Sequence, residues 1–83
     1  MKKTELRMRR LLARILDWDD NNCYFDDDLN EEVIDGTEAD VYNYVMRDDE
    51  IHLLGTETVK KIIHLYYTDY HSFTELCMEH RAH

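Results

Sequence analysis

Two groups of residues have side chains and spacings that suit metal chemistry. Asp17, Asp19 and Asn21 have the D-x-D-x-N spacing that opens a calcium-binding loop, with Asp28 at position twelve. Position six is Asn22 instead of the glycine that such a loop needs for its sharp turn. Because acids are dense in this part of the chain, a partial match arises by chance. We therefore expect no calcium site.

Cys77 and His80 stand one helical turn apart, and His83 follows one step later. Structural zinc sites usually combine two close ligand pairs, and one pair is visible here. A fourth ligand could come from Cys23, His64 or His71. Cys77 and His80 could also form a nucleophile and its base, but no Gly-rich phosphate loop or recognisable oxyanion hole accompanies them. We expect no metal, no cofactor and no enzymatic activity, and a small metal-binding domain is the third choice.

The charged residues are distributed unevenly along the chain. Positions 1–14 hold six of the ten basic residues and carry a net charge of +5, whereas positions 15–83 carry −14. Between positions 17 and 50, fourteen acids are accompanied by a single base, Arg47. Such a segment repels nucleic acid and attracts the basic surfaces that normally hold phosphates. The alternative is a solvated acidic face that keeps a small protein soluble.

These charges predict a partner-binding face on a non-enzymatic protein. Its carboxylates would replace the phosphates of a nucleic acid on a basic nucleic-acid-binding protein, and two aromatic side chains would form an apolar anchor. No direct contact with nucleic acid and none with a membrane is expected. The predicted acidic residues are Asp19, Asp20, Asp26, Asp27, Asp28, Glu31 and Glu32, and the aromatic ones are Tyr24 and Phe25.

A basic amphipathic helix over residues 4–18 precedes this face. Its apolar residues recur every three or four positions, and its basic residues fall on another face. The stripe consists of Met8, Leu11, Leu12, Ile15 and Trp18. The basic face could bind nucleic acid or an anionic membrane surface. It could equally pair with the acidic segment, either within one chain or across a homodimer.

The rest of the chain predicts shorter elements. Residues 23–25 suit a short strand or a loop anchor beneath the first helix, and residues 26–35 suit a short helix or an ordered loop. Thr37 and Thr56 are expected N-caps of helices over residues 38–47 and 57–71. Residues 41–46 can also be read as a strand, and the cap at Thr37 favours the helix. Residues 50–54 suit a short strand, and a capping box at residues 72–75 opens a final short helix.

The composition sets the scale of the fold. Eighty-three residues of 10.1 kDa form one domain, residues 1–83, and the absence of proline permits long helices. We expect a mainly α fold of about four helices with a minimal β element, with α+β as the alternative. Two cysteines are too few for a disulfide scaffold, and no apolar run reaches the roughly 20 residues of a membrane span, so a cytoplasmic location is expected.

The order of predicted elements in residues 7–66 resembles small winged-helix proteins of prophages. The resemblance rests on a first helix at residues 9–16, a helix–turn–helix over residues 33–46, and a strand at residues 49–55. It implies a winged-helix-like fold and, as the second choice of function, a regulator that binds DNA through the basic first helix. The would-be recognition helix is acidic, whereas DNA-reading helices present Arg, Lys, Asn or Gln.

Size and charge together resemble the acidic inhibitors that phages and mobile elements encode, such as DNA-mimic and anti-CRISPR proteins. This resemblance implies an inhibitor that docks on a CRISPR effector or another host defence factor. It agrees with the partner-binding face inferred from the residues and is the function expected first.

Overall fold

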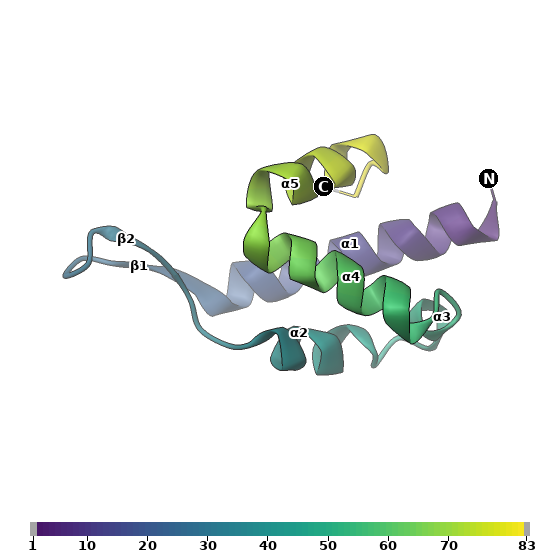
Figure 1. Ribbon diagram of the computed structural model, residues 1–83, viewed down its shortest axis with the longest axis horizontal. Helices are drawn as coiled ribbons and strands as arrows, with labels where there is room; N and C mark the ends of the chain where they lie inside the picture. Colours follow the sequence, from purple (N-terminus) through teal and green to yellow (C-terminus); the bar gives the residue numbers. More distant parts are fainter. Residues whose placement is uncertain (1, 83) are drawn as a thin grey trace.

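The longest element is the helix α1 (Lys3–Asn22), which lies along the long axis of the molecule (Figure 1). In the computed structural model, which describes residues 2–82, the molecule measures 45 × 24 × 18 Å. The predicted apolar stripe of α1 faces inward, because Leu11, Leu12, Ile15 and Trp18 are all buried. This long helix therefore provides the apolar surface against which other helices pack.

This helix continues four residues beyond its predicted end at Trp18. The side-chain amide of Asn21 donates to the carbonyl oxygen of Asp17 at 2.9 Å, and that of Asn22 donates to Trp18 at 2.8 Å. Asparagine side chains often compete with a helix for backbone hydrogen bonds. Asn21 and Asn22 instead satisfy carbonyl groups of the last turns of α1, so the helix reaches the start of the first strand.

A β-hairpin follows α1 directly and extends beyond the helices at one end of the molecule (Figure 1). Its strands are β1 (Cys23–Asp26) and β2 (Glu31–Ile34), paired antiparallel. The strand predicted at residues 23–25 is therefore confirmed, but it does not lie beneath the helix. The prediction of a short helix or loop over residues 26–35 is wrong, because the segment forms the turn and the second strand.

Two short helices continue the chain after the hairpin. The helix α2 (Glu38–Val45) begins at the predicted N-cap, where the Thr37 hydroxyl accepts from the Asp40 amide and the Asp40 carboxylate accepts from the Thr37 amide. The helix α3 (Asp49–His52) occupies most of the segment predicted as a strand. That prediction is wrong because the Asp48 side chain caps a helical turn by accepting from the amide of Glu50, and Ile51 is buried.

The last two helices are α4 (Thr56–Thr68) and α5 (Tyr70–Glu79). The residue before α4 is Gly55, at a φ of 90°, so the prediction of Thr56 as N-cap is off by one residue. The predicted helix over residues 57–71 breaks at Asp69, whose carboxylate accepts from the amide of Ser72 at 3.1 Å. The predicted capping box at residues 72–75 therefore lies inside α5, and Asp69 is its N-cap.

The helices share one apolar core, to which every helix contributes at least one buried side chain. Residues 2–82 form five helices and a two-stranded sheet, so the mainly α fold with a minimal β element is confirmed. Among the described helices, none combines the length and the apolar character needed to cross a bilayer.

Candidate protein-docking surface

The hairpin presents most of the predicted partner-binding residues at one end of the molecule. Its register places Tyr24 opposite Val33, Phe25 opposite Glu32 and Asp26 opposite Glu31. Cross-strand partners point to the same side of a hairpin, so Tyr24 and Asp26 lie on one face and Phe25 and Glu32 on the other. Both faces therefore combine an aromatic ring with carboxylates.

Three large apolar side chains of the hairpin and its turn are exposed. Tyr24 is 52% exposed, Phe25 55% and Leu29, in the turn, 61%. Large apolar side chains that project from a small protein beside charged groups are typical of interaction surfaces. Tyr24 and Phe25 were predicted as anchors, and the structure adds Leu29.

The turn of the hairpin is built by Asp26 and Asn30. One carboxylate oxygen of Asp26 accepts from the amides of Asp28 and Leu29, at 2.9 and 3.2 Å. Asn30 has a φ of 55°, a left-handed conformation that asparagine tolerates better than most residues. Asp26 therefore shapes the turn, while Asp27 and Asp28 are exposed and available for contact.

The root of the hairpin is fixed by a partly buried hydrogen-bond cluster. The Tyr66 hydroxyl and the Cys23 thiol both donate to one carboxylate oxygen of Asp19, the thiol at 2.9 Å. The amide of Asp35 donates to the carbonyl of Asn22 at 2.7 Å and closes the base of the hairpin. Asp19, predicted as a partner-binding residue, therefore binds inside the chain and orients the hairpin.

This cluster changes the acidity of its members. Burial, followed by the hydrogen bond to Asp19, raises the pKa of the Cys23 thiol to about 11. The same two causes raise the pKa of the Tyr66 hydroxyl above its ordinary value. Both groups are protonated near neutral pH, so they act as donors to Asp19 and not as nucleophiles.

Asp20, another predicted contact residue, lies apart from the hairpin cluster. It is exposed and lines a surface hollow together with Arg9 and Arg81. The structure therefore gathers seven of the nine predicted contact residues on the hairpin and leaves two on α1. The seven are Tyr24, Phe25, Asp26, Asp27, Asp28, Glu31 and Glu32.

The basic face of α1 pairs with acids around α3 and not with the hairpin. Arg7 contacts Glu50 at 3.1 Å, and the Arg10 Nε donates to Asp48 at 2.8 Å. Arg14 lies 3.7 Å from the same Asp48 carboxylate, which is buried. Of the two pairings left open by the sequence, the one within the chain is therefore formed, with Asp48 and Glu50 near the end of the acidic segment and not with the acids at 26–32.

The acids of the hairpin region keep their charge unpaired by bases. Positions 17–35 contain nine acids and no lysine or arginine. Within residues 2–82, no salt bridge involves any of these nine. The negative charge of the hairpin is therefore available to a partner.

The residues considered for metal binding are not gathered into a site in the described part of the chain. Asp17 and Asp19 belong to α1, and no group of three or more His, Cys, Asp and Glu side chains in residues 2–82 could hold a metal ion. Cys77 is buried, burial raises its pKa to about 11, and the nearby His80 contacts Glu5 at 2.7 Å. His83 lies outside the described residues.

No family model, no curated protein and no solved structure matches this chain. The function is therefore argued from the geometry of the hairpin and from the charges around it.

Proposed function

We propose that this chain is a non-enzymatic binding protein whose β1–β2 hairpin docks on a basic, nucleic-acid-binding surface of another protein. The observation that carries the proposal is the projecting hairpin itself, with unpaired carboxylates beside exposed Tyr24 and Phe25. The class of partner that size and charge suggest is a host defence factor, such as a CRISPR effector, which the chain would inhibit by occupying its nucleic-acid site.

The register supports this proposal, because it places acids directly opposite each other. Asp26 pairs with Glu31 across the two strands. Like charges at directly opposed positions destabilise a hairpin. A basic partner surface would remove this repulsion, so the pair favours the bound state over the free one.

The shape of the hairpin also supports docking into a groove. Two strands alone are narrow, and their faces are covered by no other element at the tip (Figure 1). Carboxylates at the tip would steer the encounter with a positive surface, and the aromatic rings would then exclude water from the contact. Charge and apolar anchors therefore serve successive steps of the same association.

The experiment compares two charge-reversed variants in affinity capture. Asp27→Lys with Asp28→Lys alters the hairpin but keeps Asp26, which holds the turn. The matched control, Glu75→Lys with Glu79→Lys, makes the same change of charge on exposed positions of α5. Both baits and the wild type are incubated with a nuclease-treated bacterial lysate, and retained proteins are identified by mass spectrometry.

We expect wild type and control to retain the same basic nucleic-acid-binding protein and the hairpin variant to lose it, with affinity lowered at least about 100-fold. Retention by all three baits would contradict the proposal. Retardation of DNA by the chain itself would instead favour the regulator that reads DNA through α1.

A further inference from the structure

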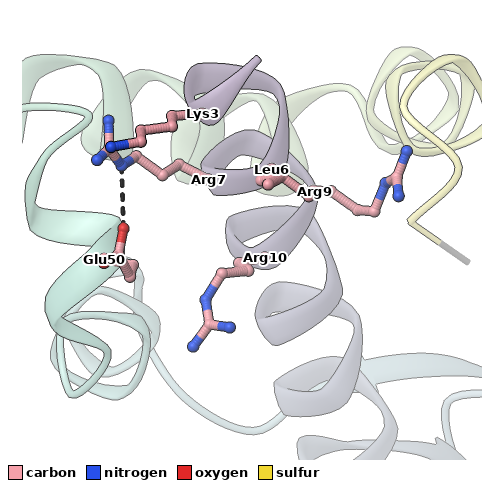
Figure 2. A pocket seen from close by; sticks show the side chains of 6 residues that line it. All are labelled: Lys3, Leu6, Arg7, Arg9, Arg10 and Glu50. Carbon is pink, nitrogen blue, oxygen red and sulfur yellow. Dashed lines mark hydrogen bonds and ion pairs between the residues drawn. The ribbon is translucent and has the colours of Figure 1, made fainter. Parts of the chain in front are cut away.

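A second surface lies at the other end of the long axis, where the basic part of α1 faces α3. Figure 2 shows Lys3 and Arg7 to one side of Leu6 and Arg9 to the other. Together with Arg10 and Glu50 they line a groove with a volume of about 340 Å³. Leu6 is 45% exposed. The groove thus combines an apolar floor with four cations and a single carboxylate.

Internal contacts hold the three arginines of the groove in position without using all their donors. Arg7 pairs with Glu50, and the Arg9 Nε donates to the carbonyl of His80 at 2.8 Å. A guanidinium has five N–H donors, so one contact of this kind leaves others for a ligand. Since the arginine side chains are already ordered, less conformational entropy is lost when a ligand with carboxylates binds.

We propose that this groove binds the hairpin tip of a second copy of the chain, so that molecules associate head to tail. The tip presents the exposed carboxylates of Asp27 and Asp28 beside the exposed Leu29. The carboxylates of the tip would form ion pairs with the cations of the groove, and Leu29 would pack against Leu6. Phosphates of a nucleic acid would find the same cations but have no apolar group for Leu6.

The positions of the two surfaces exclude their pairing within one molecule. The hairpin and the N-terminal part of α1 lie at opposite ends of a molecule 45 Å long (Figure 1). Physiological salt screens charges over about 8 Å, so each contact senses the local charges more than the net charge of −9. The contact joins two different surfaces, so repetition produces open chains of molecules unless the rotation closes a ring.

Head-to-tail contact covers the hairpin that the proposed function assigns to another protein. A basic partner and a second copy would therefore compete for the same residues. The proposal does not depend on that function, since association is measured with the purified chain alone.

The test uses two variants that each remove one half of the contact. Asp27→Asn with Asp28→Asn removes two carboxylates from the tip, and Lys3→Gln with Arg7→Gln removes two of the four cations from the groove. Leu6→Gln is a second groove variant that leaves the ion pairs in place. The matched controls are Glu75→Gln with Glu79→Gln and Lys60→Gln with Lys61→Gln, all at exposed positions. Thermal unfolding establishes that each variant is folded.

Sedimentation velocity at rising protein concentration and in 0.05–0.5 M salt then gives the average mass. We expect the mass of the wild type and the controls to rise with concentration and to fall with salt. The tip variant and both groove variants should remain monomeric at 10.1 kDa. An equimolar mixture of the tip variant with the double groove variant should form a dimer, because one intact tip and one intact groove remain.

A wild type that stays monomeric at millimolar concentration would overturn the proposal. So would a tip or groove variant that associates as strongly as the wild type, or a mixture that stays monomeric while the wild type associates. None of these outcomes bears on capture of a foreign protein, so the two proposals can fail separately.

Discussion

At the scale of single residues, acids of the same type have different roles in this chain. Asp48 is buried, caps α3 and accepts from Arg10, whereas Asp27 and Asp28 are exposed at the tip of the hairpin. Asp19 orients the hairpin through Tyr66 and Cys23. The acids of the structure and those of the proposed contact are therefore separable by mutation.

Replacement of Asp48 tests the structural role of a buried carboxylate. Asp48→Ala removes the cap of α3 and the partner of Arg10 and Arg14, so we expect a loss of about 2 kcal/mol in the free energy of unfolding. The arginines remain partly exposed and solvated, which limits the loss. Asp48→Asn keeps a capping oxygen and should lose about half as much. Urea unfolding measures both, and equal losses would contradict the capping role.

The hydrogen-bond cluster at the root of the hairpin should slow the reaction of the Cys23 thiol with alkylating reagents. A pKa of about 11 leaves roughly 100-fold less thiolate on Cys23 than in an unfolded chain, where cysteine titrates near 8.5. We expect iodoacetamide at pH 8 to label Cys23 about 100-fold more slowly in the native chain than in urea. Peptide mapping separates it from Cys77, which is buried.

The same raised pKa sets a pH dependence. Because the protonated thiol is favoured by folding, its contribution to stability is present below about pH 8.5 and is lost as the pH rises through 11. Fast labelling of Cys23 at pH 8 would show that the thiol does not donate to Asp19 in solution.

The sequence predicted the exposed acids of the hairpin, but it did not predict which acids form hydrogen bonds within the chain. Thr37 was predicted as an N-cap because Glu38 follows it in the first turn, and its partner in the structure, Asp40, is only three residues away. The role of Asp19 could not be predicted in this way, since Tyr66 is 47 residues distant in the sequence. Leu29 was not predicted as a contact residue, because the turn that exposes it was not recognised.

At the scale of elements, Gly36 determines how the hairpin connects to α2. It has a φ of 149°, and a Cβ atom there would lie 2.6 Å from the Cζ2 atom of Trp18. The Tyr67 hydroxyl also donates to its carbonyl at 2.7 Å. The chain therefore passes closely over a buried indole, which leaves no room for a side chain.

Substitution of the two glycines should have unequal effects. Gly36→Ala combines backbone strain with a clash against buried Trp18, and we expect a loss of about 2–4 kcal/mol in the free energy of unfolding. Gly55→Ala, at a φ of 90° with nothing within 4 Å of the added atom, should lose about 1–2 kcal/mol from strain alone. Chemical unfolding of both variants gives the comparison, and a smaller loss at Gly36 would contradict the close approach.

Elements with a long apolar period could be predicted from the sequence, and short ones could not. The stripe of α1 and that of α4 each extend over several turns. The four residues of α3 depend on one cap and one buried side chain, which is too little signal for a periodic pattern. The four-residue strands of the hairpin have mixed burial and no clear alternation. The break at Asp69 was missed because the apolar period continues through it.

At the scale of the whole molecule, the charge asymmetry of the sequence becomes an asymmetry in space. The rigid helix α1 carries its basic residues at one end and leads into the acidic hairpin at the other (Figure 1). The sequence implied that the basic and acidic residues lie far apart, because it predicted a long basic helix followed by an acidic segment. That the segment would project as a hairpin was not implied, because only its first strand was predicted and the second was not.

The measurement that tests the docking proposal most directly is displacement of nucleic acid from the captured partner. A labelled oligonucleotide bound to that protein is titrated with the wild type, with the Asp27→Lys and Asp28→Lys variant, and with the Glu75→Lys and Glu79→Lys control. We expect the wild type and the control to release the oligonucleotide at one molecule per site, and the hairpin variant to need at least about 100-fold more. Equal displacement by all three, or binding of the chain without release of the oligonucleotide, would contradict docking of the hairpin in the nucleic-acid site.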